Sequence, residues 1–281
     1  MKVAELKDPE AEHKLNQNGF ILIRNFLNRD EVAALYALYK GKHAKADSEK
    51  GMWNSLYDIT PEEGLAISNN ILDIVRPRLN EIFVSHYAPV GTFMSKNCNP
   101  NSTCDLHRDF SILNESEFQY RNIWIPVVST TNNNGALYVL KGSHQVFDYV
   151  LPFLTEWPYK NMQDELFPMV ETIDANAGDL VIYIDKTLHG SHINYSNDSR
   201  PVVHFGAMHP DVQLQFFQLD NKKENVQVYD VPFKFFFERD FDVVAEKYPL
   251  SRQFKYNPPA LKTEEAKTKL NAFTFASSVK K

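Results

Sequence analysis

Two residues in the stretch LHRDF carry side chains that are able to bind a metal ion. His107 and Asp109 stand two positions apart, and in an extended chain such residues point to the same face. An imidazole and a carboxylate would then reach the same place. The pair could be half of a metal site, a hydrogen-bonded structural pair or a coincidence, and only a third ligand elsewhere in the chain would favour the metal site.

The third ligand is sought among the later histidines, which are His144, His189, His192, His204 and His209. We favour His189, because it starts a short stretch of strand character soon after the predicted strand VIYI. The residues NYSND (194–198) have turn composition, and the midpoint between His189 and Arg200 falls inside them. We therefore predict an antiparallel hairpin with His189 and Arg200 nearly opposite, on strands about 4.8 Å apart. Ser191 shares the face of His189.

The other histidines have structural interpretations. His192 points away from the predicted ligand by strand parity, and His144 lies in the turn-like sequence KGSHQ. His209 stands at the end of a predicted strand. His204 shares the strand face of Arg200, so it belongs either to the core or to the surroundings of the site, and the sequence does not decide between these.

Two imidazoles and one carboxylate form the ligand set of non-haem Fe(II) oxygenases, which leave open positions on the ion. A 2-oxo acid could occupy two of these positions and O2 the third. Arg200 and Ser191 would hold the far end of a dicarboxylate such as 2-oxoglutarate, because a guanidinium binds a carboxylate through two parallel hydrogen bonds.

Residues 1–85 are predicted to be rich in helix. GFILIRNFL (19–27) has the composition of a strand. Apolar residues at helical spacing follow Asp30, which we expect to be the N-cap of a helix. Residues 61–83 also have helical periodicity, and we expect Pro77 to end or kink this helix.

Residues 86–232 are predicted to form the core, since short runs rich in β-branched and aromatic residues recur there between turn signals. The runs are APVGTFMSK, FQYRNIWIPVV, GALYVL, FPMVETID, GDLVIYI, LHGSHI, PVVHFGAM and VQLQFFQL. Strands of this number and length favour a sandwich or a jelly-roll, cupin-like barrel. Residues 233–281 are predicted to be a helical extension. We expect one domain over residues 1–281, mostly β with flanking helices (α+β).

Composition excludes several classes of function. The 281 residues carry a net charge of −6, which disfavours nucleic acid as a partner. We expect no membrane partner, because no run of about 18 apolar residues occurs. The N-terminus lacks the apolar region of a signal peptide, so we expect a cytoplasmic, reducing location. The two cysteines, Cys98 and Cys104, are interpreted as structural or incidental.

The chain resembles the phytanoyl-CoA dioxygenase family of Fe(II)- and 2-oxoglutarate-dependent oxygenases. The stretches that carry the resemblance are NGFILIRNFLNRDEVAAL, LHRDF, NIWIPVVSTTNNNGALYVLKGSH and HGSHINYSNDSR. The resemblance implies a double-stranded β-helix with the iron ligands His107, Asp109 and His189. It also implies a 2-oxoglutarate site made of Arg200, Ser191, Trp124 and Thr92. Trp124 would equally suit ordinary core packing, because large aromatic side chains fill small barrels.

The predicted function is hydroxylation of a C–H bond in a small organic metabolite, with release of succinate and CO2 and with ascorbate as a reductant. Other functions remain open. A halogenase is disfavoured by Asp109, because related halogenases have a small residue there. A differently acting cupin-like metal-binding protein, such as a metal-dependent hydrolase or isomerase, would not need Arg200 and Ser191. A non-catalytic binding protein should have lost part of the set, which is complete here. Asp109 is also compatible with a 2-oxoglutarate-dependent desaturase or cyclase of secondary metabolism.

Overall fold

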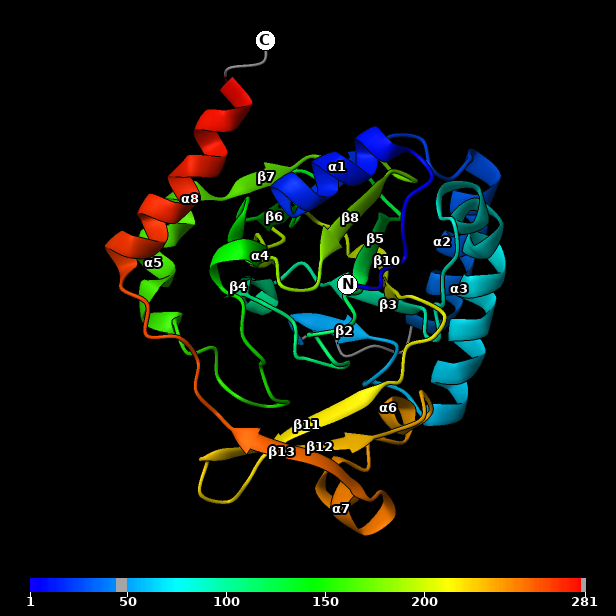
Figure 1. Ribbon diagram of the computed structural model, residues 1–281. Coiled ribbons are helices and arrows are strands. Elements are labelled where there is room, and N and C mark those ends of the chain that lie inside the picture. Colours follow the sequence, from blue (N-terminus) through cyan, green and yellow to red (C-terminus); the bar gives the residue numbers. More distant parts are fainter. Residues whose placement is uncertain (44–49, 279–281) are drawn as a thin grey trace.

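The protein is built around two antiparallel β-sheets that face each other, with a smaller third sheet set to one side. The computed structural model describes residues 1–43 and 50–278 (Figure 1). The large sheet has the order β1 (Phe20–Ile23), β8 (Leu180–Ile184), β5 (Arg121–Pro126), β10 (Arg200–Ala207), β3 (Thr92–Lys96) and β2 (Met52–Asn54). The sheet opposite has the order β4 (Cys104–His107), β9 (His189–Ser191), β6 (Leu137–Val139) and β7 (Glu171–Ile173). This arrangement confirms the predicted β core with flanking helices.

The interior between the two sheets explains why the strand β8 reads LVIYI without a polar residue. Val181 and Tyr183 pack with residues of both sheets in the interior. Leu180, Ile182 and Ile184 point to the other face, where they pack against the helices. A strand that is covered on both faces is usually apolar at most positions, and all five residues of β8 are buried.

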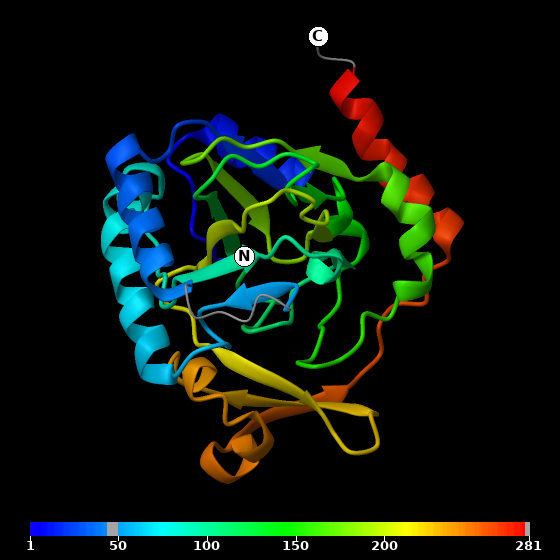
Figure 2. The same ribbon diagram turned by 180° about the vertical axis from the view of Figure 1, so that it is seen from behind.

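Three helices cover the outer face of the large sheet, as Figure 2 shows from behind. They are α1 (Pro9–Asn18), α2 (Arg29–His43) and α3 (Pro61–Ile82). The helix α3 matches its predicted range, but Pro77 lies inside it and does not end it. The cost of an internal proline is about 3 kcal/mol, and burial of Val75 and Leu79 on the same helix face offsets it.

The start of α2 differs from the prediction in its capping residue. The side-chain oxygen of Asn28 accepts hydrogen bonds from the backbone N–H groups of Asp30 and Glu31, each at 2.9 Å. Asn28 is therefore the N-cap, and the expectation for Asp30 is wrong. Asp30 and Glu31 instead lie in the first turn, where their charges interact favourably with the helix dipole.

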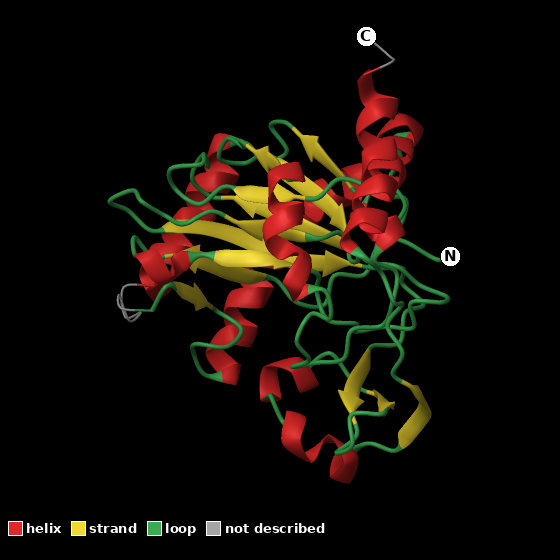
Figure 3. Ribbon diagram, turned by 90° about the vertical axis from the view of Figure 1, so that its left-hand side faces the viewer, coloured by secondary structure: helices red, strands yellow, loops and turns green. Residues whose placement is uncertain are grey.

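The C-terminal part is not simply a helical extension. It contains the helices α6 (Phe235–Glu238), α7 (Val244–Lys247) and α8 (Thr263–Ser278), but also the strand β13 (Leu250–Lys255). β13 completes a three-stranded sheet with β11 (Gln215–Leu219) and β12 (Asn225–Asp230), which lies apart from the main sheets in Figure 3. The prediction missed β13 because an edge strand with no fully buried side chain has no apolar pattern to detect.

The remaining helices are short. α4 (Ser143–Val146) and α5 (Gln163–Leu166) lie near α8, whose Lys267 forms an ion pair with Glu165 at 2.8 Å. Within residues 1–43 and 50–278, no helix is long and apolar enough to cross a membrane.

Candidate metal and cosubstrate site

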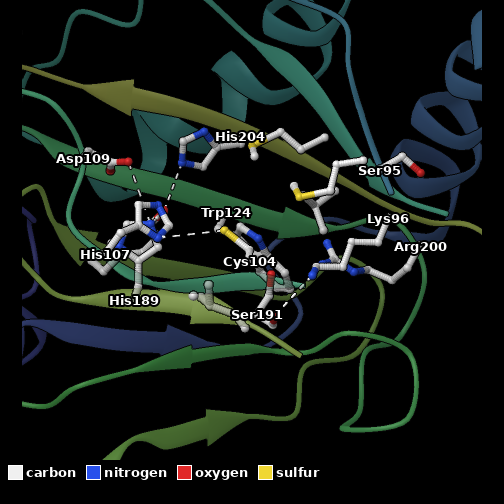
Figure 4. Close-up of a pocket in the computed structure, with 16 residues that line it drawn as sticks. Ser95, Lys96, Cys104, His107, Asp109, Trp124, His189, Ser191, Arg200 and His204 are labelled. Atoms are coloured by element: carbon white, nitrogen blue, oxygen red, sulfur yellow. Dashed lines mark hydrogen bonds and ion pairs between the residues drawn. The ribbon is translucent and has the colours of Figure 1, made fainter. Parts of the chain in front are cut away.

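The three predicted metal ligands come together at one end of the small sheet. His107 ends β4 and His189 begins β9, and these two residues are directly paired across the neighbouring strands. Asp109 follows two residues after the end of β4. The ligand atoms of all three side chains lie within 4.8 Å of one another, and His189 Nε2 is 3.8 Å from Asp109 Oδ1 (Figure 4). This arrangement fits one metal ion.

Both imidazoles are oriented by backbone carbonyl groups. His107 Nδ1 lies 2.7 Å from the carbonyl oxygen of Asp105, and His189 Nδ1 lies 3.0 Å from that of Thr187. A carbonyl oxygen only accepts, so each Nδ1 carries a proton, and Nε2 is the atom of each ring that can bind a metal. Hydrogen bonds of this kind fix the tautomer and the ring orientation of metal-binding histidines.

The two imidazoles differ in their readiness to take up a proton. Burial lowers the pKa of His189 to about 4, so this ring is neutral at neutral pH, as metal binding requires. Burial also acts on His107, but the negative charges of Cys104 and Asp109 outweigh it and raise the pKa of His107 to about 10. At neutral pH a proton therefore competes with a metal ion at His107 and not at His189.

Three further side chains support the ligands, and the sequence analysis did not predict this role for any of them. Asn122 of β5 donates a hydrogen bond to Asp109 Oδ2 at 2.8 Å. The hydroxyl of Tyr183 lies 3.4 Å from His189 Nε2 and 3.0 Å from His204 Nε2. His204 thus belongs to the surroundings of the site, which answers the question that its strand parity left open.

A cavity of about 70 Å³ lies between the two sheets beside the ligands. Its wall includes the three ligands and, among others, Lys96, Cys104, Trp124, Ser191, Arg200 and His204. The guanidinium carbon of Arg200 lies 5.6 Å from the centre of the Trp124 ring. The structure therefore brings Arg200, Ser191 and Trp124 together with the ligands, as predicted (Figure 4).

The predicted hairpin between His189 and Arg200 is wrong. Arg200 begins β10 in the large sheet and is paired with Lys96 of β3, whereas His189 belongs to the small sheet. The segment between them carries the chain from one sheet to the other. It is fixed by Asn194, whose backbone N–H donates to Ser102 Oγ at 2.9 Å and whose side chain donates to the carbonyl of Lys96 at 3.1 Å.

Arg200 has a buried charge without a counter-charge. Its exposed fraction is 3%. Within residues 1–43 and 50–278 its guanidinium forms no ion pair, and its Nε has no hydrogen-bond partner. A buried unpaired charge is costly, and a guanidinium is suited to a carboxylate. The site therefore fits a ligand that has a carboxylate at the end away from the metal.

Thr92 does not form part of the cavity wall, although the family resemblance placed it near the cosubstrate. Its hydroxyl donates to the carbonyl oxygen of His204 at 2.9 Å. Met94 and Lys96, two and four residues further along β3, share its strand face and do line the cavity. On β3 the cavity wall is therefore formed by residues later than Thr92.

The cysteines form no disulfide, and both are free thiols. Cys104 nevertheless lines the cavity, with its Sγ 3.9 Å from His107 Nδ1. The interpretation of Cys104 as structural or incidental missed this position. An irregular register between Cys104 and His107 allows both side chains to face the cavity, which simple strand parity does not predict.

Arg108, between two of the ligands, points away from the cavity and fixes the ligand loop. Its guanidinium forms an ion pair with Glu115 at 2.7 Å and donates to the carbonyl of Tyr149. The side chains of Arg108 and Glu115 are 1% and 6% exposed. Lys186 adds a second contact to Glu115 at 3.5 Å. This buried pair connects the loop that carries His107 and Asp109 to neighbouring segments.

We predict that Glu115→Ala lowers the free energy of unfolding by about 3–5 kcal/mol, because it leaves the Arg108 charge buried and unpaired. Chemical denaturation monitored by circular dichroism measures this change. Glu156→Ala is the matched control, because its ion pair with Lys160 is exposed and such pairs contribute about 1 kcal/mol or less. Equal small losses in both variants would show that the buried pair does not stabilise the ligand loop.

The site and the fold together define a class of protein. Two imidazoles and one carboxylate, beside an unpaired buried guanidinium in a double-stranded β-helix, are the features of non-haem iron enzymes that use a 2-oxo acid. Residues 15–202 match the model of the family described as Phytanoyl-CoA dioxygenase (PhyH), and the chain belongs to this family. The matched range contains the three ligands and Arg200. Membership confirms the predicted class, an Fe(II)- and 2-oxoglutarate-dependent dioxygenase.

Comparison with individual proteins agrees with the family assignment. The chain is 24% identical over 215 residues to "Dioxygenase aneA" of Aspergillus aculeatus, which covers 68% of each protein. The fold is similar to that of the non-heme alpha ketoglutarate dependent carbocyclase SnoK from nogalamycin biosynthesis, with a TM-score of 0.55, 17% identity and coverage of 74% of this chain and 86% of SnoK. It is also similar to HygX from Streptomyces hygroscopicus with nickel and 2-oxoglutarate bound, with a TM-score of 0.53, 13% identity and coverage of 73% and 88%.

Proposed function

We propose that this dioxygenase hydroxylates a C–H bond of a small organic metabolite, with conversion of 2-oxoglutarate and O2 to succinate and CO2. The observation that carries the proposal is the position of two complementary features in one cavity. The ligand set of His107, Asp109 and His189 lies in and beside the small sheet. The unpaired charge of Arg200 lies in the large sheet that faces it.

Each group of residues has a separate role in this proposal. His107, Asp109 and His189 would hold Fe(II), and Asn122 keeps the carboxylate of Asp109 in place through its hydrogen bond. Iron supplies the reaction with O2 that side chains alone do not provide. Arg200 and Ser191 would hold the distal carboxylate of 2-oxoglutarate, and Trp124 would form the wall beside it. Ascorbate would serve as the reductant that keeps the iron in the Fe(II) state.

The kind of oxidation is inferred from the ligand set, and the kind of substrate is inferred from the net charge of the chain. Asp109 supplies the carboxylate that supports hydroxylation over halogenation. Relatives in fold include a carbocyclase and the epimerase SnoN, so a cyclisation or desaturation is the alternative outcome for this site. The net charge of −6 supports a small metabolite over a polyanionic partner.

The test is succinate formation by the purified protein with Fe(II), ascorbate and 2-oxoglutarate in air, without a prime substrate. We expect slow turnover that stops when Fe(II) is removed with a chelator. Asp109→Asn is the matched control, because the amide is nearly isosteric but lacks the charge, and we expect a folded protein that forms no succinate. A wild-type protein that binds metal and 2-oxoglutarate but forms no succinate with any candidate metabolite would indicate a non-catalytic binding protein.

A further inference from the structure

A second buried cation, Lys96, lies next to Arg200 in the cavity wall. Lys96 is fully buried, and its backbone is paired with that of Arg200 across β3 and β10. Figure 4 shows the two side chains side by side at the end of the cavity away from the metal ligands. Lysine is rarely buried without a partner, so its position calls for a physical reason.

The contacts of Lys96 leave its charge uncompensated. Its Nζ donates to the carbonyl oxygens of Ser191, at 3.2 Å, and of Ser102. An ammonium group has three donors, so one remains. In the part of the chain that the structure describes, Lys96 forms no ion pair within 4.0 Å.

The charged and titratable groups that face Lys96 come from several elements. Arg200 of β10 disfavours its charge, and Cys104 and Asp105 of β4 favour it. His192, which follows β9, is also within electrostatic reach. Among the described residues, no carboxylate lies within ion-pair distance of either of these two neighbouring cations, and together they form a site for an anionic group.

We propose that Lys96 is a second cation for the distal carboxylate of the 2-oxo dicarboxylic acid, and that binding of this acid is coupled to uptake of a proton by Lys96. This inference rests on the proposed function, because it assumes that 2-oxoglutarate binds with its distal end at Arg200. It adds a specificity-determining residue to the cosubstrate site. Lys96 would also hold β9 in place through the carbonyl of Ser191.

The pKa of Lys96 determines how the affinity for the oxo acid changes with pH. Burial, and then the charge of Arg200, lower the pKa of Lys96 to about 7. A carboxylate bound beside it raises this pKa again. Below about pH 7 Lys96 is protonated with and without the acid, so the affinity is constant there. Above about pH 7 the free site has lost the proton and the bound site keeps it, so the affinity falls by up to about tenfold per pH unit.

The wild-type holoprotein provides a first test that needs no mutation. The protein loaded with Ni(II) is titrated with 2-oxoglutarate by isothermal calorimetry between about pH 6 and pH 9, in buffers of different ionisation enthalpy. We expect net uptake of a fraction of a proton at about pH 8, together with the predicted fall in affinity. Binding with no proton uptake over this range would overturn the inference and leave the proposed function intact.

Lys96→Met provides the second test, because methionine keeps the length of the side chain and removes the charge. We expect at least tenfold weaker binding of 2-oxoglutarate at about pH 6 and loss of the pH dependence. Ni(II) affinity and the affinity for 2-oxopentanoic acid, which lacks the distal carboxylate, should stay close to wild type. Lys160→Met, at an exposed lysine, is the matched control.

The results separate this inference from the proposed function. Equal weakening of both oxo acids in Lys96→Met would assign Lys96 a purely structural role and overturn the inference. An unchanged affinity and pH profile in that variant would overturn it as well. Absence of any 2-oxoglutarate binding to the wild-type holoprotein would instead contradict the proposed function itself.

Discussion

His189→Ala should lower the affinity of the protein for Fe(II) by at least about 100-fold and abolish succinate formation. Loss of a residue that only orients a ligand already costs about 10–100-fold in metal affinity, and His189 is itself placed as a ligand, paired with His107 across β4 and β9. The measurement is an anaerobic titration of the metal-free protein with Fe(II). The weak visible absorption that develops when 2-oxoglutarate joins Fe(II) in the wild type should also be absent.

His192→Ala is the matched control for this experiment. His192 lies three residues further along, lines no part of the cavity, and its Nε2 is 2.9 Å from the hydroxyl of Thr172. We expect wild-type metal affinity in this variant. Full metal affinity in His189→Ala would show that the ligand is another histidine, and His204, whose ring is close to that of Tyr183, would be the first to examine.

The second large effect is expected at Arg200. Arg200→Leu should weaken 2-oxoglutarate binding by about 30-fold to several thousand-fold, because truncating one partner of a buried charge pair costs roughly 2–5 kcal/mol. Arg200→Lys should fall between Leu and wild type, since lysine has a charge but no planar fork of donors. Metal affinity should change little in both variants, because Arg200 is not a ligand.

Cosubstrate titration of the Ni(II)-loaded proteins measures these effects. A 2-oxo acid without a distal carboxylate should lose much less affinity than 2-oxoglutarate does. Arg76→Lys is a suitable control, because Arg76 is half exposed and pairs with Asp73 of its own helix. Equal 2-oxoglutarate affinity in the wild type and in the Lys and Leu variants would remove Arg200 from the site and leave the cosubstrate assignment without its main support.

The grouping of His107, Asp109 and His189 with Arg200 around one cavity could be predicted because the chemistry of these side chains is visible in short sequence motifs. His107 and Asp109 share a strand face by local parity, and His189 and Arg200 stand in a stretch with few competing residues. Their mutual geometry could not be predicted in the same way. A turn between two strands looks alike in sequence whether the strands pair or belong to different sheets, and only the partners of β10, such as Lys96 in β3, decide this.

Three other residues of the site were harder to predict, and the reason is different for each of Lys96, Asn122 and Cys104. Lysine is usually a surface residue, so its residue type does not suggest that Lys96 lies in a cavity. The only indication of this position is that Lys96 shares strand parity with Thr92 and Met94. Asn122 stands on a buried strand where a polar side chain is unusual, and this was an available signal. Cys104 faces the cavity through an irregular strand register, which depends on pairing with β9 and leaves no trace in the local sequence.

The order of strands in the large sheet has a consequence for synthesis of the chain. β1 is paired with β8, so that Ile23 lies opposite Leu180 and Phe20 opposite Tyr183, which are 157 and 163 positions away. At a translation rate of about 5–20 residues per second, β1 waits about 8–30 s for its partner to be synthesised. During this time an apolar strand has an unpaired edge, which is a template for pairing with other chains. Protection of this edge during translation is therefore a requirement that the order of the strands places on folding of the chain.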